Sequence, residues 1–213
     1  KYVDGGFTDN LPVGLALDHG ATHVIAVNLE SVGVIRKERL TDANYIRIIQ
    51  CPWDLGNILI FDKNNSKKIM RLGYLDTLKT FRVFDGNYFC FVKDELDLRR
   101  IHGAEAAGLI FELDPEIIYK KHVFNLRLKD AVESHLSAME KEPGSEENNL
   151  PAKIIERIQK AKSTLSQKTL TLTIARSFKE PELTKNIFLS RPAMRLLRNE
   201  ILAANYLVKE GLI

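Results

Sequence analysis

The sequence predicts a mixed α/β fold, a mainly parallel sheet with flanking helices that is followed by a mainly helical extension. Residues 13–19 have a helical pattern and lead into residues 22–29, an almost continuous apolar run rich in β-branched side chains. Such a run is typical of a strand buried on both faces of a parallel sheet. After residue 84 most apolar residues recur at helical spacing. We therefore predict an α/β core over residues 1–83 and a mainly helical extension over residues 84–213.

The chain opens with a strand end and a sharp turn. An apolar pair leads into Asp4, and Gly5 and Gly6 follow at once. Glycine adopts positive φ without a steric penalty, so the pair marks a turn directly after the strand. Binding and catalytic groups of open α/β sheets gather at the carboxyl ends of strands. Asp4 is therefore a candidate functional carboxylate.

A helix is predicted directly after this turn. Asn10 is a good N-cap residue, and Pro12 is tolerated in the first turn of a helix over residues 13–19. Gly20 is the expected stop in the left-handed region. Asp9 is interpreted as a solvated carboxylate that the helix dipole favours.

The rest of the first part contains a short strand and a long helix. Residues 45–49 are predicted to be a strand that extends the sheet. The apolar cluster Ile58–Phe61 is interpreted as core packing, with a lipid-facing lip of a cleft as the alternative. A helix over residues 62–81, capped by Asp62, has apolar residues at helical spacing.

The second part is expected to be mainly helical. A turn at 84–87 and a strand at 88–92 come first, and the remaining helices are predicted at 104–112, from Asp114-Pro115 onward, at 124–139, 152–166 and 192–209. Residues 140–151 are polar and contain two prolines and a glycine, which predicts a linker. Residues 169–174 alternate Thr with Leu or Ile, which favours a strand, although their neighbours leave a helix open.

The first block resembles a known family. The spacing D-G-G-x-x-x-N-x-P at residues 4–12, followed by a helix and by G-A-x-x-V-I-A-V, resembles the second catalytic block of patatin-like phospholipases. The resemblance is strongest over residues 1–29 and weaker over 54–57 and 72–78. It implies that the core is the C-terminal part of a patatin-like sheet. It also implies a Ser–Asp dyad in which Asp4 is the catalytic aspartate that acts as the base, and Gly5 and Gly6 form the active-site turn.

The same resemblance implies an activity. A patatin-like enzyme cleaves acyl esters of phospholipids or lysophospholipids through an acyl-enzyme, without a metal or cofactor. A serine hydroxyl needs an adjacent base, which here would be Asp4 with no histidine between. A carboxylate with a solution pKa of about 3.9 is a weak base at neutral pH. Partial burial would raise that pKa and strengthen the base.

Two catalytic motifs of the family do not occur in the sequence. Neither the nucleophile elbow G-x-S-x-G nor the oxyanion motif D-G-G-G-x-R-G is present, and Ser31, Ser66 and Ser190 lack flanking glycines. We therefore expect a C-terminal fragment whose nucleophile is supplied by an N-terminal part of the same protein. This chain alone is expected to be inactive. The alternatives are a catalytically inactive relative that binds lipid or a partner, and a plain α/β binding domain.

Composition excludes several other classes. The net charge is +3 and the basic residues form scattered pairs, so nucleic-acid binding is not expected. No apolar run approaches the roughly 18 residues that cross a membrane. Any contact with a membrane is therefore expected to be peripheral. Cys51 and Cys90 give no disulfide framework and fit a reducing compartment, so we expect a cytoplasmic protein. His19 and His23 would not share a helix face, and no metal site is predicted.

Overall fold

A computed structural model describes residues 7–29, 33–56, 62–140, 165–179, 188 and 190–213. The fold is mixed α/β with small sheets, one of them a parallel pair, which confirms the predicted class at this level. The chain divides into two compact units, Lys1–Cys90 and Phe91–Ile213. The predicted boundary lay slightly earlier, between residues 83 and 84.

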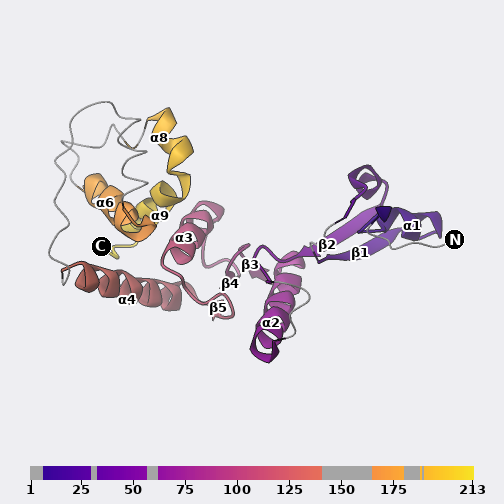
Figure 1. Ribbon diagram of the computed structural model, residues 1–213, viewed down its shortest axis with the longest axis horizontal. Coiled ribbons are helices and arrows are strands. Elements are labelled where there is room, and N and C mark those ends of the chain that lie inside the picture. The colour runs from indigo at the N-terminus through magenta and orange to yellow at the C-terminus, as the bar shows by residue number, and fades with distance from the viewer. Residues whose placement is uncertain (1–6, 30–32, 57–61, 141–164, 180–187, 189) are drawn as a thin grey trace. The chain divides into compact units, whose positions relative to one another are not determined.

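The first unit contains a helix and a parallel strand pair. Helix α1 (Val13–Asp18) ends before Gly20, whose φ of +89° fits the predicted stop. Strands β1 (His23–Asn28) and β2 (Tyr45–Gln50) run side by side in parallel (Figure 1), with Val24 opposite Ile46. The strand predicted at residues 45–49 is thus confirmed, and it extends the sheet as expected.

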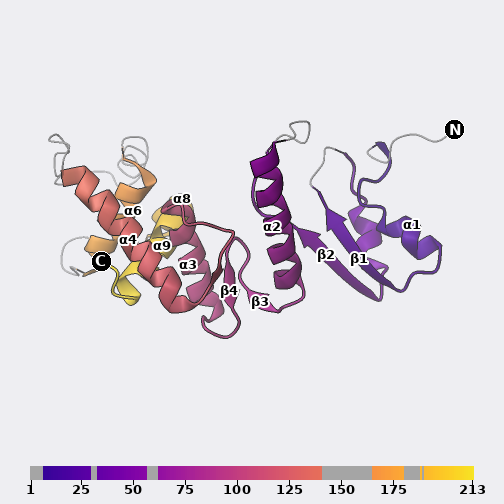
Figure 2. The same cartoon turned by 90° about the horizontal axis from the view of Figure 1, so that it is seen from below.

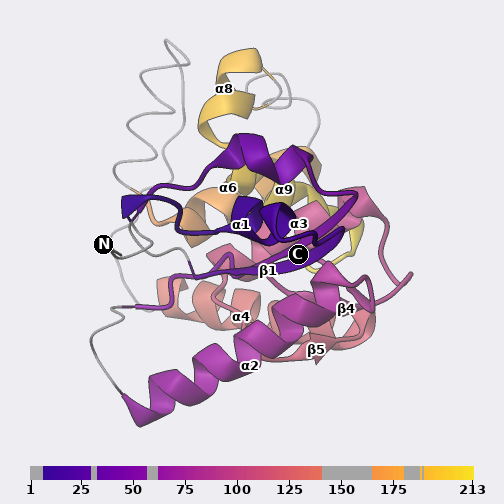
Figure 3. The ribbon, with the colours of Figure 1, turned by 90° about the vertical axis from the view of Figure 1, so that its right-hand side faces the viewer.

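One face of this strand pair is covered by apolar side chains. Val24 and Ala26 of β1 are buried together with Leu11 and Val13, from the start of the α1 region. The 3₁₀ helix η2 (Lys37–Thr41) packs on the same cluster. Figure 3 shows α1 on one side of the strand pair and α2 on the other.

The opposite face of β1 differs from the prediction. Residues 22–29 were expected to be buried on both faces, but the side chains of Ile25 and Val27 are 61% and 57% exposed. Burial alternates along the strand, and α2 contacts β2. The prediction was wrong because an apolar run records hydrophobicity and not whether a second layer is present to cover it.

Helix α2 (Lys63–Thr80) confirms the predicted helix and its cap. An Asp62 carboxylate oxygen accepts a hydrogen bond of 2.6 Å from the backbone N–H of Asn65. Leu72 and Leu75 are buried. Figure 2 shows α2 next to β2, which the helix contacts.

Three short strands, β3 (Phe84–Asp85), β4 (Cys90–Val92) and β5 (Ile118–Tyr119), form a second sheet in that order. The strand predicted at 88–92 is therefore present in a shorter form. The helix predicted from Asp114 onward is wrong. The Asp114 carboxylate accepts the backbone N–H of Glu116 at 2.8 Å, an Asx turn that leads into β5.

The second unit is mainly helical, as expected. Among its described residues the helices are α3 (Leu98–Ile110), α4 (Lys121–Glu140), α6 (Gln167–Lys179), α8 (Arg191–Leu196) and α9 (Arg198–Lys209). The helix predicted at 124–139 is confirmed by α4. Helix α3 begins earlier than predicted because Asp97 caps it, accepting the backbone N–H of Arg100 at 2.9 Å.

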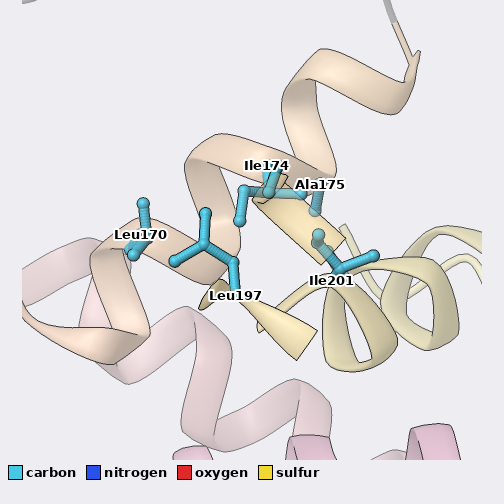
Figure 4. Close-up of a cluster of buried hydrophobic side chains, with 7 residues drawn as sticks. Leu170, Ile174, Ala175, Leu197 and Ile201 are labelled. Carbon is cyan, nitrogen blue, oxygen red and sulfur yellow. The ribbon is translucent and has the colours of Figure 1, made fainter. Parts of the chain in front are cut away.

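Two predictions for the C-terminal region are wrong. Residues 169–174 belong to α6 and not to a strand, because α6 buries Leu170 and Ile174 against Leu197 and Ile201 (Figure 4). The single helix expected over 192–209 is two helices, α8 and α9. Leu197, with φ −121° and ψ 33°, separates them.

Some predicted features lie outside the described residues. They are the turn at 4–6, the cluster Ile58–Phe61, the linker beyond Glu140 and the helix at 152–166 up to residue 164.

Candidate functional site

The predicted catalytic residues Asp4, Gly5 and Gly6 lie outside the described residues, which begin at Phe7. The described part of this region is the segment that follows them, residues 7–12, which leads into α1. Phe7 is 81% exposed. The contacts that hold residues 7–12 therefore define the described geometry of the candidate site.

Asp9 organises the segment. Its Oδ1 atom accepts backbone N–H groups from Leu11 at 3.2 Å and from Arg36 at 3.3 Å. The Arg36 side chain returns a bond, donating from Nε to the carbonyl oxygen of Thr8 at 3.2 Å. These bonds connect the segment before α1 to the chain that follows β1.

The two segments meet beyond the carboxyl end of β1. The backbone N–H of Asn10 donates to the carbonyl oxygen of Val34 at 2.5 Å, and residues 33–36 follow β1 along the chain. In a parallel α/β arrangement the carboxyl ends of strands share an edge with the amino ends of helices. The segment thus occupies the kind of edge at which α/β proteins build their sites.

Two roles predicted for this segment are wrong. Asn10 does not cap α1, because the helix begins at Val13 and Pro12 occupies the cap position without a side-chain cap bond. Asp9 is not simply a solvated carboxylate, because it binds two backbone N–H groups. Its partner Arg36 lies 27 residues away, and local sequence carries no signal for such a contact.

Arg39 of η2 holds the other end of α1. Its guanidinium lies 2.7 Å from an Asp18 oxygen and 3.1 Å from an Asp42 oxygen. A Cβ atom at Gly14 would lie 3.2 Å from Arg39 Nε and 3.3 Å from its Cγ. Gly14 therefore provides the space in which the arginine crosses α1, and this arrangement fixes η2 on the helix.

His19, His23, Ser66 and Ser190 make local contacts, and Ser31 lies outside the described residues. His19 Nδ1 lies 2.8 Å from the carbonyl oxygen of Leu15, and His23 Nδ1 lies 3.0 Å from Thr22 Oγ1. Ser66 donates to the carbonyl oxygen of Asp62 at 2.7 Å, and Ser190 caps α8. Within the described part of the chain, no three metal-ligating side chains come together.

A buried charged pair was missed by the sequence reading. Lys79 Nζ lies 2.8 Å from Asp76 Oδ1, and both side chains are almost fully buried in α2. Lys79 also donates to the carbonyl oxygen of Asn87. The available signal was Asp76 itself, a carboxylate four residues after Leu72 on the apolar face of a helix.

Both cysteines are close enough to this pair to interact with it. Burial, followed by a hydrogen bond to the Asp76 carboxylate, raises the pKa of Cys51 to about 11. Burial raises the pKa of Cys90 to about 11, and the positive charge of Lys79 opposes that rise. Both thiols are thus protonated at neutral pH, which makes them poor nucleophiles.

Comparisons with known protein families, with curated proteins and with solved structures gave no match to this chain.

Proposed function

We propose that this chain is the C-terminal part of a patatin-like serine acyl hydrolase, in which Asp4 is the base of a Ser–Asp dyad and Gly5 and Gly6 form its turn. The observation that carries the proposal is the spacing D-G-G-x-x-x-N-x-P, followed by α1 and β1. Its substrates are acyl esters of phospholipids or lysophospholipids, and its location is the cytoplasm. No metal or cofactor takes part.

The contacts after the turn support this proposal. Hydrogen bonds of Asp9 and Arg36 hold residues 8–11 against the segment that follows β1. The loop before α1 therefore has a fixed position. A base must be held within hydrogen-bonding reach of the group that it deprotonates. A firmly held segment that begins four residues after Asp4 is suited to that requirement.

The exposed face of β1 favours the proposal that a further segment of the protein packs on it. Parallel sheets are almost always covered on both faces, yet Ile25 and Val27 are more than half exposed. The sequence lacks the glycine-flanked serine of the family. One additional segment that carried the serine and covered this face would account for both observations.

In the proposed reaction, Asp4 takes the proton from the serine hydroxyl as its oxygen attacks the ester carbonyl carbon. The tetrahedral intermediate collapses to an acyl-enzyme, and the released alkoxide takes the proton back from Asp4. A water molecule then attacks the acyl carbon of the acyl-enzyme while Asp4 accepts a proton from it. The bond between the acyl carbon and the serine oxygen breaks, Asp4 returns that proton to the serine oxygen, and the fatty acid is released.

The experiment compares this chain with a longer protein that includes the coding sequence preceding Lys1. We expect only the longer protein to hydrolyse a chromogenic fatty-acid ester and to react with a fluorophosphonate that labels activated serines. Hydrolysis by this chain alone that survives Asp4→Ala would contradict the proposal. A preceding segment without a glycine-flanked serine would instead favour the inactive relative.

A further inference from the structure

Helix α2 has two faces of different character. Leu72, Leu75 and Asp76 are buried on one side. The opposite side, which we call the outer stripe of α2, follows the helical spacing i, i+4, i+7, i+8 and i+11 and continues at the end of the helix. The outer stripe consists of Lys63, Lys67, Met70, Arg71, Tyr74 and Phe81.

Large apolar side chains of the outer stripe face solvent. Met70 is 75% exposed, Tyr74 is 56% exposed and Phe81 is 41% exposed. Single exposed apolar residues are normal in any protein. Met70 and Tyr74, however, are neighbours one turn apart on the same helix face, which produces a local apolar surface.

The charged residues of α2 before Asp76 are all cations. From residue 63 to residue 75 the helix contains four cations, Lys63, Lys67, Lys68 and Arg71, and no carboxylate. The carboxylate that follows, Asp76, is buried and pairs with Lys79 at 2.8 Å. Residues 63–75 of this helix therefore carry four positive charges and no negative charge.

Cationic and apolar side chains are interleaved along the stripe. The Arg71 guanidinium lies over the Tyr74 ring, 5.6 Å from its centroid. This geometry lets one surface offer an aromatic side chain and a cation together. Such interleaving is typical of helices that lie in the headgroup region of a membrane.

We propose that α2 docks its outer stripe onto an anionic lipid bilayer. The lysine and arginine side chains contact the lipid phosphate or carboxylate groups, and Met70 and Tyr74 enter the boundary between headgroups and acyl chains. No helix in the described residues is long and apolar enough to span a membrane, and the proposal requires α2 only to lie in the surface. It rests on α2 alone and does not require acyl hydrolase activity.

Lipid fits the outer stripe better than nucleic acid does. Contacts to a phosphate backbone use cations and leave Met70 and Phe81 without a role. A bilayer interface satisfies both kinds of side chain at once, because charged headgroups and acyl chains lie a few ångströms apart.

The test is co-sedimentation of the full chain with vesicles of phosphatidylcholine, alone and mixed with phosphatidylserine. The charge variant is Lys63→Gln/Lys67→Gln/Arg71→Gln. Its control, Lys93→Gln/Lys120→Gln/Lys209→Gln, removes the same net charge from exposed positions outside α2. We expect wild type to prefer the anionic vesicles. The charge variant should lose about a hundredfold in partition coefficient, roughly fivefold per cation, and the control should lose less than about threefold.

A second variant tests the apolar contribution. Met70→Gln/Tyr74→Gln keeps the charge and the helix propensity, which circular dichroism verifies, and should weaken binding to anionic vesicles about tenfold. Equal sedimentation with both vesicle types, an equal loss in the control triple variant, or an unchanged apolar variant would each overturn the proposal. So would single-stranded RNA that binds the stripe more tightly than the anionic vesicles.

Discussion

The Asp76 carboxylate and the Lys79 ammonium group lie 2.8 Å apart in α2, with side chains that are 4% and 9% exposed. Lys79 also donates a hydrogen bond to the carbonyl oxygen of Asn87, in the connection between β3 and β4. The pair therefore links the end of α2 to the following turn through a contact from which water is largely excluded.

Removing one member of this pair should be strongly destabilising. In Asp76→Ala a buried ammonium group loses its counter-charge, and we expect the free energy of unfolding to fall by about 3–5 kcal/mol in urea titrations. The control is Asp76→Leu/Lys79→Met, which removes both charges and should remain much closer to wild type. Equal losses in the single and double variants would show that the charge pairing is not what stabilises this region.

Gly103 should be intolerant of a side chain. A Cβ atom there would lie 3.0 Å from Tyr206 Cβ and 3.3 Å from the carbonyl oxygen of Leu202, both in α9. Gly103→Ala should destabilise the second unit by about 1–3 kcal/mol. The matched control is Gly73→Ala in α2, which meets nothing within 4 Å and should stabilise by up to about 1 kcal/mol. A stabilising Gly103→Ala would contradict the close contact of α3 with α9.

Acid should weaken the contact between α4 and α6. His135 Nε2 lies 3.1 Å from Thr169 Oγ1, and burial, followed by the charge of Lys168, lowers the pKa of His135. The unfolded chain, with a histidine pKa of about 6.5, then binds this proton more readily than the folded chain. The contribution of His135 to stability is therefore complete above that pH and is lost as the pH falls through its lowered folded pKa.

The measurement is the free energy of unfolding at neutral and at mildly acidic pH for wild type and for His135→Gln. We expect wild type to lose more stability on acidification than the variant, because glutamine does not titrate. A larger pH dependence in His135→Gln would contradict the lowered pKa.

The two faces of β1 should respond differently to substitution. Val24 is buried, so Val24→Ala should cost about 2 kcal/mol. Ile25 is 61% exposed, so Ile25→Thr should change the stability of this chain by less than about 0.5 kcal/mol. In a longer protein whose added segment covers this face, Ile25→Thr should cost clearly more. An equally small effect in both proteins would argue against such a covering segment.

Local signals predicted the elements that depend on local contacts. Asp62 was identified as the cap of α2, and Gly20 as the stop after α1, because each acts on backbone within a few residues. Residues 169–174 were assigned to a strand on their alternation. In the structure α6 buries Leu170 and Ile174, four residues apart, against α9, so tertiary packing decided between two periods that the sequence allowed.

The candidate site was predictable only in part. Asp4, Gly5 and Gly6 were selected from a motif and stay a prediction, because they lie outside the described residues. The anchoring of Asp9 by Arg36, and the pairing of Asp76 with Lys79 near two cysteines, needed the fold. The exposure of the Ile25 and Val27 side chains could not be predicted from their hydrophobicity, because it depends on which elements pack against that face of β1.

The most direct test of the proposed function is the rate of ester hydrolysis by the longer protein with Asp4→Asn. The matched control is Asp9→Asn, a nearby isosteric change that leaves an oxygen able to accept the Leu11 and Arg36 N–H groups. We expect Asp4→Asn to lower kcat by about 10²–10⁴-fold with little change in KM, and Asp9→Asn to keep most of the activity. An Asp4→Asn variant with a kcat close to wild type would contradict the assignment of Asp4 as the catalytic base.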